Sequence, residues 1–229
     1  MTALPVVTLD VFSALIDSRT GGSAALGCIA RDRGWSAGGA EVYDRWDTLN
    51  KRAQRDCVDW VSYAALARDA LAAAYASLAV EGDSGAQADA DVVTLLESLP
   101  GWPLWPDVAS GLAALVGHYR VGLLTNIDDE LLARTRVAAL VDPELALTSE
   151  RLRAYKPGPR IYRKARRRLG PMIHVATSGR DVRGALEAGL TVVRLRRPGH
   201  SLDPDGPHPA NEAGDLTELA TLLERVNCG

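Results

Sequence analysis

Lysine is scarce in this sequence. Lys51, Lys156 and Lys164 are its only lysines, although lysine and arginine together number 26 in 229 residues. Such a scarcity, beside abundant alanine, is typical of a bias in codon usage, so an isolated lysine carries more meaning here than usual. The net charge of −3 and the isoelectric point near 5.8 do not indicate a nucleic acid or an anionic membrane as a partner.

Cysteine is equally rare. Cys28, Cys57 and Cys228 are odd in number, lie far apart and form no Cys-x-x-Cys pair, which argues against a disulfide framework and against a zinc site. No apolar run approaches the roughly 20 residues of a membrane span, and no basic stretch precedes an apolar one near the first residue. We therefore expect a soluble protein of the reducing cytoplasm.

Strand and helix patterns alternate along most of the chain. The length fits one domain with a sizeable insertion. Short apolar, β-branched runs predict strands at 6–9, 121–126, 145–149, 172–178 and 191–195, with helical patterns between them and a loop at 198–213. Strands that alternate with helices at this spacing predict an α/β fold of Rossmann-like type, in which a parallel sheet is the middle of three layers.

The stretch from 24 to 98 has no strand character. Its apolar spacing predicts helices at about 24–35, 40–54, 61–79 and 91–98, with a polar, glycine-bearing link at 18–23 and a loop at 81–90. This stretch is typical of an all-helical module inserted between two parts of another fold.

Polar residues follow several of the expected strands. They are Asp10 after the first strand, Thr125 and Asn126 after the second, Lys156 in a later loop, and Thr177, Ser178 and Asp181 after the fourth. The carboxyl ends of parallel strands meet at one edge of the sheet, so a single pocket can collect these side chains. Each residue taken alone also has an ordinary explanation, as a turn cap, a helix cap or a surface lysine.

The order of these motifs resembles the haloacid dehalogenase (HAD) superfamily. The resemblance lies in Asp10, Thr125-Asn126, the segment Tyr155-Lys-Pro-x-Pro-x-Ile-Tyr162, and the segment Asp181-Val-x-Gly-Ala-x-x-Ala-Gly189. It covers essentially the whole chain and implies an α/β core domain of residues 1–17 and 100–229. Residues 18–99 would then form a helical cap domain.

The resemblance also implies roles for these residues in a hydrolase. Asp10 would attack the substrate and form a covalent aspartyl intermediate that water hydrolyses. Lys156 would keep Asp10 ionised, since an opposite charge within about 4–6 Å typically lowers an Asp pKa by 1–3 units. Asp181 would orient or deprotonate the water. The substrate-binding residues would be Phe12, Ser13, Thr125, Asn126, Thr177 and Ser178.

Two departures from the phosphatases of this superfamily bear on the reaction. Phe12 stands where they carry a second Asp that protonates the leaving alkoxide, and Thr177 stands where the first of two magnesium-binding acids is expected. Members that displace halide from 2-haloacids carry an aromatic residue at the position of Phe12 and work without metal, and this chain resembles them. The resemblance thus implies no metal and no cofactor. Ala14, however, replaces a hydroxyl residue expected in these dehalogenases, and Ser13 compensates weakly.

Three hypotheses follow from these residues. The first is a metal-independent, dehalogenase-like hydrolase that acts at a carbon of a small anionic acid. The second is a magnesium-dependent small-molecule phosphatase with an altered metal site, and the third is a catalytically silent HAD-fold binding protein. The cap residues considered for the pocket wall are Trp46, Trp60, Arg19 and Arg45. The sequence leaves open whether the chain forms a homodimer.

Three histidines are the remaining candidates for site residues. His174 lies inside the fourth expected strand, where we expect it to pack in the core rather than act as a base. His200 and His208 lie in the proline-rich loop, for which we expect solvated positions, with an approach to the pocket as the alternative.

Overall fold

A parallel six-stranded sheet forms the centre of the α/β part of the chain. The computed structural model describes residues 4–80, 82 and 84–227, and its strand order is β3-β2-β1-β4-β5-β6. The strands are β1 (Val6–Leu9), β2 (Arg120–Thr125), β3 (Ala146–Thr148), β4 (Met172–Ala176), β5 (Thr191–Leu195) and β6 (Asn211–Ala213), and each neighbouring pair is parallel. The predicted parallel α/β fold is confirmed. The short strand β6, whose Asn-Glu-Ala sequence has no apolar run, was missed within the expected loop at 198–213.

Alternation along the buried strands produces the layers. In β1, Val7 and Leu9 join one apolar cluster, together with residues of α5 (Val108–Val116) and α10 (Leu216–Asn227). Val6 points to the opposite face and packs with residues of α8 (Pro159–Leu169) and α9 (Gly179–Glu187). Successive side chains of a strand point to opposite faces, so one strand serves both layers. The short helices α6 (Asp129–Ala133) and α7 (Ser149–Leu152) complete this part.

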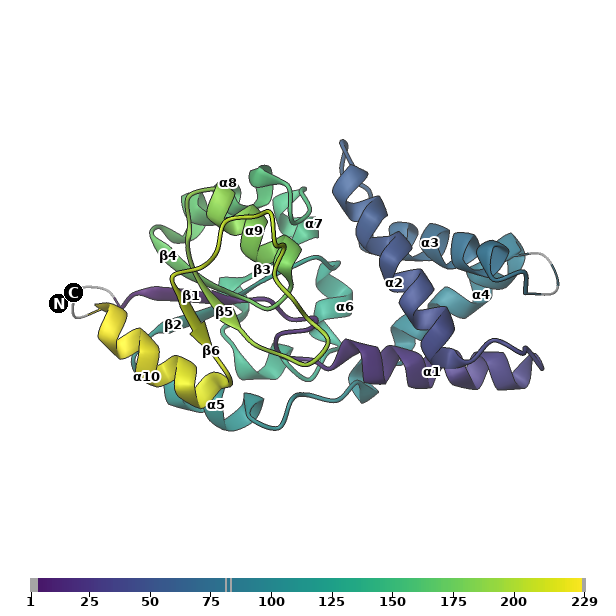
Figure 1. The fold of residues 1–229 in the computed structure, drawn as a ribbon, viewed down its shortest axis with the longest axis horizontal. Helices are drawn as coiled ribbons and strands as arrows, with labels where there is room; N and C mark the ends of the chain where they lie inside the picture. Colours follow the sequence, from purple (N-terminus) through teal and green to yellow (C-terminus); the bar gives the residue numbers. More distant parts are fainter. Residues whose placement is uncertain (1–3, 81, 83, 228–229) are drawn as a thin grey trace.

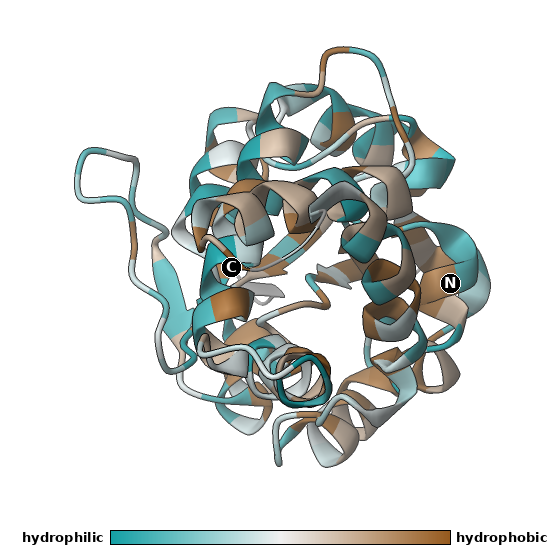
Figure 2. Cartoon of the chain, turned by 90° about the vertical axis from the view of Figure 1, so that its right-hand side faces the viewer, coloured by the Kyte–Doolittle hydropathy of each residue, from teal (hydrophilic) through white to brown (hydrophobic). Residues whose placement is uncertain are grey.

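Four helices lie beyond the carboxyl edge of the sheet, on the right in Figure 1. They are α1 (Ser18–Asp32), α2 (Gly39–Asp56), α3 (Tyr63–Ser77) and α4 (Ser84–Glu97), and each contacts the next in order. Hydrophilic and hydrophobic residues alternate around their ribbons, as expected of helices with one buried and one exposed face (Figure 2). We propose that residues 18–99 form the cap and residues 1–17 and 100–229 the core. Among the described helices, none is long and apolar enough to cross a membrane.

The polar link expected at 18–23 is wrong, because helix α1 begins at Ser18. The Asp17 carboxylate accepts a hydrogen bond from the Thr20 backbone N–H at 3.1 Å and caps the helix. The glycines that indicated a link serve close packing: a Cβ at Gly21 would lie 2.4 Å from the Trp102 ring, and one at Gly22 would lie 2.3 Å from the Tyr43 ring.

The loop expected at 81–90 is also wrong over most of its length, because α4 begins at Ser84. Residues 81 and 83 lie outside the described part. Asp91 connects this helix to its neighbours, since it is 5% exposed and its carboxylate accepts from Arg33 at 2.5 Å and from the Tyr75 hydroxyl of α3 at 3.0 Å. A composition rich in Ala, Gly, Ser and Asp suits a loop in isolation, and tertiary contacts overrode it.

Candidate active site

A buried ammonium group joins two carboxylates at the carboxyl edge of the sheet. Lys156 Nζ donates to Asp10 Oδ1 and to Asp181 Oδ2, both at 2.6 Å, and to the Leu124 carbonyl at 2.7 Å. The three charged residues are 4%, 6% and 2% exposed respectively. The structure therefore brings together the three residues predicted to be catalytic. The triad carries one net negative charge when all three are ionised.

Each of these groups has a shifted pKa. Burial raises the pKa of Asp10, and the Asp181 carboxylate adds to the rise against the opposing Lys156 ammonium. Burial alone would raise the pKa of Asp181, but Lys156 and His174 hold it well below its usual range. Burial lowers the pKa of Lys156, and the two carboxylates more than reverse this. Lys156 thus lowers the Asp10 pKa as predicted, but the net shift of Asp10 is upward.

Two residues outside the predicted set hold Asp181. The Tyr162 hydroxyl donates to Asp181 Oδ1 at 2.7 Å, and His174 Nε2 lies 3.2 and 3.3 Å from the two carboxylate oxygens. The other ring nitrogen of His174 lies 3.0 Å from the Thr8 hydroxyl. His174 is fully buried as predicted, but it also supports the site. Tyr162 is the last residue of the Tyr155–Tyr162 motif, so that motif is the sequence signal that could have identified it.

The segment after Asp10 forms one wall of the site. Ser13 has a φ of +80°, a left-handed conformation that a non-glycine residue adopts at some cost. Its hydroxyl donates to Asp10 Oδ2 at 3.4 Å, and its carbonyl accepts from the Trp105 indole at 3.0 Å. The Phe12 ring packs edge-on against Trp102, with centroids 6.0 Å apart. Phe12 and Ser13 both line the cavity in front of Asp10.

The residues after β2 have different environments. The Thr125 hydroxyl is buried and has no hydrogen-bond partner within the described part of the chain. The Asn126 amide, in contrast, is fully engaged: its oxygen accepts from the Lys156 backbone N–H at 2.8 Å, and its nitrogen donates to the Lys156 carbonyl at 2.9 Å. Both residues line the cavity. Thr125 can therefore donate to a ligand, whereas Asn126 holds the backbone of the lysine.

The two residues after β4, Thr177 and Ser178, also differ in their environments. Ser178 lines the cavity. Thr177 is fully buried and its hydroxyl donates to the Leu195 carbonyl at 2.8 Å. The structure thus does not bring Thr177, predicted as a substrate-binding residue, to the cavity.

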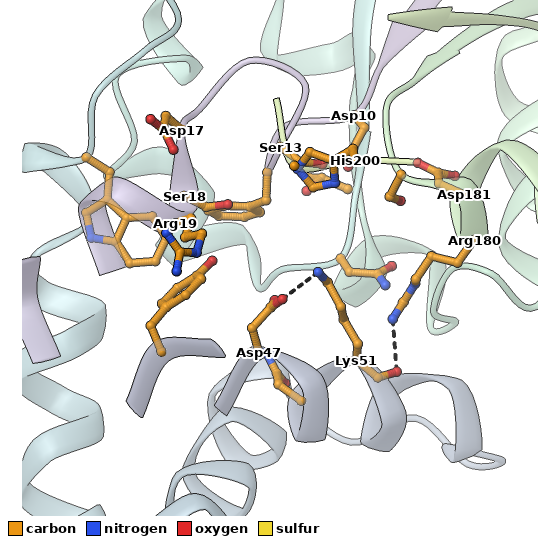
Figure 3. A pocket seen from close by; sticks show the side chains of 18 of the residues that line it. Asp10, Ser13, Asp17, Ser18, Arg19, Asp47, Lys51, Arg180, Asp181 and His200 are labelled. Atoms are coloured by element: carbon orange, nitrogen blue, oxygen red, sulfur yellow. Dashed lines mark hydrogen bonds and ion pairs between the residues drawn. The ribbon is translucent and has the colours of Figure 1, made fainter. Parts of the chain in front are cut away.

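The cavity has a volume of about 590 Å³ and lies between the sheet edge and the helices α1 and α2 (Figure 3). Trp46 and Arg19 line it as predicted, but Trp60 and Arg45 do not. Instead, Arg153 stacks on the Trp60 ring at 4.1 Å and Arg45 donates to Ser77. Its other lining residues include Lys51, Gln54, Trp102, Trp105 and Arg180, which sequence reasoning did not single out. His200 also lines the cavity, so the solvated position expected for it is wrong and the alternative, an approach to the pocket, holds.

Arg180 connects the two sides of this cavity. Its guanidinium donates to the Lys156 carbonyl at 2.7 Å on the sheet side. On the α2 side it donates to the Lys51 carbonyl at 2.9 Å and to Gln54 Oε1 at 3.1 Å. The residue directly before Asp181 therefore ties α2 to the backbone of the site lysine.

Comparison with known proteins decides the family. The family model for haloacid dehalogenase-like hydrolases matches residues 5–189, which is most of the chain. The chain belongs to the haloacid dehalogenase-like hydrolase family. An (S)-2-haloacid dehalogenase of Burkholderia cepacia is 33% identical over 128 residues, and this match covers 53% of the chain and 55% of that protein. The match thus spans about half the length of the relative.

Solved structures of this family share the fold over nearly the full chain. An L-2-haloacid dehalogenase from Xanthobacter autotrophicus has a TM-score of 0.80 and 20% identity, and covers 97% of this chain and 99% of that one. A structure of that enzyme with chloropropionic acid covalently bound has a TM-score of 0.79 at the same identity and coverage. A defluorinating L-2-haloacid dehalogenase has a TM-score of 0.78 and 25% identity, and covers 96% and 95% of the two chains.

The oxygen and nitrogen groups of this site do not suit magnesium. Mg²⁺ prefers an octahedron of hard oxygen ligands, usually one or two carboxylates with water and phosphate. The two Asp181 oxygens already accept from Lys156, Tyr162 and His174, and neither Phe12 nor Thr177 adds a carboxylate. Among the described residues, no group of three or more His, Cys, Asp or Glu side chains gathers at a metal-binding distance.

Proposed function

We propose that this protein is a metal-independent hydrolase of the 2-haloacid dehalogenase type. In this proposal, Asp10 displaces halide from the carbon that bears the carboxylate of a small acid, and water then hydrolyses the aspartyl ester. The observation that carries the proposal is the Asp10 carboxylate, which faces a cavity beside the Lys156 ammonium. Position 12 supplies no proton donor, and the described residues gather no set of carboxylates for magnesium. The similarity to an (S)-2-haloacid dehalogenase supports it.

The first step is a displacement at an sp³ carbon. An oxygen of Asp10 forms a bond to that carbon, and the carbon–halogen bond breaks with its electron pair on the halide. Halide is a stable anion, so its departure needs no proton, and Phe12 is compatible with this step where an acid would be needed for an alkoxide. The Lys156 ammonium, which is buried and held by Asp10 and Asp181, balances the negative charge of the reacting groups.

The substrate carboxylate needs donors that the protein has not already used. The Thr125 hydroxyl is buried and without a partner within the described residues, so we assign it to the substrate carboxylate. Ser178 is a second donor on the cavity wall. Asn126 is assigned a positioning role, because its amide binds both backbone groups of Lys156.

Asp181 is assigned the roles of holding Lys156 and of orienting the water that hydrolyses the ester. Both of its oxygens are engaged, and its pKa lies well below its usual range, far from the value near the working pH that suits a general base. Its buried contacts with Tyr162 and His174 keep the lysine aligned on Asp10.

A substrate screen tests the proposal against its two alternatives. The purified protein would be incubated with short 2-haloacids and, separately, with phosphate esters, each with added Mg²⁺ and with EDTA. We expect halide release that EDTA does not change. Phosphate release that depends on Mg²⁺ would favour the phosphatase and overturn the proposal. The absence of turnover with both substrate classes would favour a catalytically silent binding protein.

A further inference from the structure

One wall of the cavity holds a buried polar group that the proposed reaction does not use. Asn50 of α2 is 3% exposed and lines the cavity. Its side-chain oxygen, Oδ1, has no hydrogen-bond partner within the described part of the chain. Most buried side-chain polar atoms are hydrogen-bonded, because an unsatisfied acceptor costs free energy. The oxygen therefore indicates a ligand group that donates a hydrogen bond.

Tyr63, the first residue of α3, lies beside Asn50. The Asn50 side-chain nitrogen donates to the Tyr63 hydroxyl at 3.4 Å, and Tyr63 also lines the cavity. Burial raises the pKa of Tyr63, so its hydroxyl keeps the proton at neutral pH. Because the hydroxyl oxygen accepts from Asn50, that proton can be donated to a ligand.

Tyr63 is tied to the loop after β2 through its backbone. Its N–H donates to the Asp128 carboxylate at 2.8 Å, and the N–H of Ala64 donates to the same carboxylate at 3.0 Å. These bonds satisfy two N–H groups at the start of α3. Asp128 comes three residues after Thr125, the donor assigned above to the substrate carboxylate. The first turn of α3 therefore lies against the loop that carries this donor.

Asn50 is held near the same loop by the next turn of α2. Gln54 lies four residues beyond Asn50, on the same face of the helix, and accepts from Asn126 at 2.9 Å. Arg180 donates to the Lys51 carbonyl at 2.9 Å, and Figure 3 shows this contact joining α2 to the opposite side of the cavity. Asn50 thus belongs to the wall of the cavity that faces the nucleophile.

The pair of Asn50 and Tyr63 presents one acceptor and one donor at neighbouring positions. A hydroxyl group of a ligand suits both, because it can donate to Asn50 Oδ1 and accept from the Tyr63 hydroxyl. Rotation of the Asn50 amide by half a turn exchanges these roles, and a hydroxyl group remains suited. A carboxylate only accepts and an ammonium only donates, so each satisfies one member of the pair. An alkyl group would satisfy neither.

We propose that Asn50 and Tyr63 form a specificity-determining subsite for a hydroxyl group of the substrate. The inference rests on the proposed function and narrows its substrate class to short 2-haloacids that carry a hydroxyl group on their side chain. The cavity volume of about 590 Å³ leaves room for such a group. The subsite acts in binding and takes no part in bond-making at Asp10.

Two pairs of substrates of equal size test the subsite. The first pair is 2-chloro-3-hydroxypropanoate and 2-chlorobutanoate, and the second is 2-chloro-4-hydroxybutanoate and 2-chloropentanoate. In each pair a hydroxyl group replaces a methyl group. A site built to bind a hydroxyl group discriminates strongly against the analogue that lacks it, because its own polar groups are then left unpaired. We expect kcat/KM for chloride release to be about 100-fold higher for the hydroxy acid in at least one pair.

Two variants assign this preference to the pair of residues. Tyr63→Phe removes the hydroxyl, and Asn50→Leu replaces the amide with an apolar group of similar size, so each should lower the preference about tenfold. The preference is a ratio measured on one protein, so a smaller folded fraction does not change it. Tyr75→Phe is the matched control and should keep the wild-type ratio, because the Tyr75 hydroxyl is also buried, donates to Asp91 at 3.0 Å and does not line the cavity.

The outcomes separate the subsite from the proposed function. Equal kcat/KM values within both pairs would overturn the inference and leave the proposed function standing, because water would then satisfy the two residues. A preference that persists in both Tyr63→Phe and Asn50→Leu would also overturn the inference. If none of the acids releases chloride, the proposed function fails, and calorimetric binding of the same acids to the wild-type protein decides the subsite. Tighter binding of a hydroxy acid than of its partner would support the subsite, and equal binding would overturn it.

Discussion

Asn126 at the end of β2 donates a hydrogen bond of 2.9 Å to Oε1 of Gln54 on α2. The same Gln54 oxygen accepts from Arg180 at 3.1 Å, and both donors also bind the Lys156 carbonyl. One oxygen of the proposed cap is therefore bonded to two residues that hold the backbone of the site lysine. This arrangement couples the position of α2 to the geometry of Lys156.

Replacement of Gln54 tests this coupling. Gln54→Leu removes the acceptor and leaves buried donors of Asn126 and Arg180 with fewer partners, so we expect unfolding to become easier by about 1–3 kcal/mol and kcat/KM to fall at least 10-fold. Gln54→Glu keeps an acceptor oxygen and should retain more activity than Gln54→Leu. Steady-state kinetics and urea unfolding measure both effects.

Arg52→Leu serves as the control for Gln54→Leu, because Arg52 lies on the exposed side of the same helix. Equal activity in Gln54→Leu and Arg52→Leu would contradict the coupling.

The two carboxylates on Lys156 should differ in their effect on stability at pH 7. Because the pKa of Asp10 is higher in the folded protein than its usual 3.8, the protonated carboxyl group stabilises the fold at a pH below 3.8. This contribution is lost as the pH rises through the raised pKa of the folded protein. We therefore expect Asp10→Asn to be inactive but no less stable than wild type. The lowered pKa of Asp181 contributes stability above 3.8 that is lost as the pH falls through the lowered value.

Asp181→Asn should accordingly destabilise the protein at pH 7 by about 1–3 kcal/mol, because buried donors of Lys156, Tyr162 and His174 lose a carboxylate acceptor. The difference from wild type should shrink below about pH 3.8. Urea unfolding over a pH series measures it. An Asp10→Asn protein that is less stable than Asp181→Asn at pH 7 would contradict this account.

The first chemical step should have an acid limit set by Asp10. Only the ionised carboxylate is nucleophilic, and burial raises its pKa above the usual 3.8. We expect the rate of the halide burst to be constant near neutral pH and to fall as the pH decreases, with a midpoint above 3.8. Rapid-quench measurements of halide release between pH 3 and pH 8 test this, and a midpoint below 3.8 would show that Lys156 dominates over burial.

Tyr162 provides a comparison of two similar hydrogen bonds. Its hydroxyl donates to the buried carboxylate of Asp181 at 2.7 Å, and the Tyr75 hydroxyl donates to the buried carboxylate of Asp91 at 3.0 Å, away from the cavity. Tyr162→Phe and Tyr75→Phe should each lower stability by about 1–3 kcal/mol. Only Tyr162→Phe should also reduce the rate of the halide burst, by roughly tenfold. An equal burst rate in the two variants would limit Tyr162 to a structural role.

The sequence predicted the parts of this site that follow from local pattern and sheet topology. Asp10, Lys156 and Asp181 follow different strands of a parallel sheet, so the meeting of carboxyl ends at one edge predicted their proximity. The α/β fold followed from the alternation of buried strands with helices.

Other parts depend on contacts between distant segments. His174 looked like a core residue, and only the register of β1 with β4 places its ring between Thr8 and Asp181. The upward pKa shift of Asp10 depends on burial and on a second carboxylate, which the sequence pattern does not quantify. His200 lies in a loop whose conformation is fixed by Arg194 and Arg197, so its position in the cavity had no local signal.

The central claim is that Asp10 forms a covalent ester that water hydrolyses. The most direct measurement is a single turnover with excess protein in H₂¹⁸O, followed by mass spectrometry of the peptide that contains Asp10 and of the product. The account predicts ¹⁸O in the Asp10 carboxylate and none in the new hydroxyl group of the product. Label in the product hydroxyl with an unlabelled Asp10 would contradict it, because water would then have attacked the substrate directly.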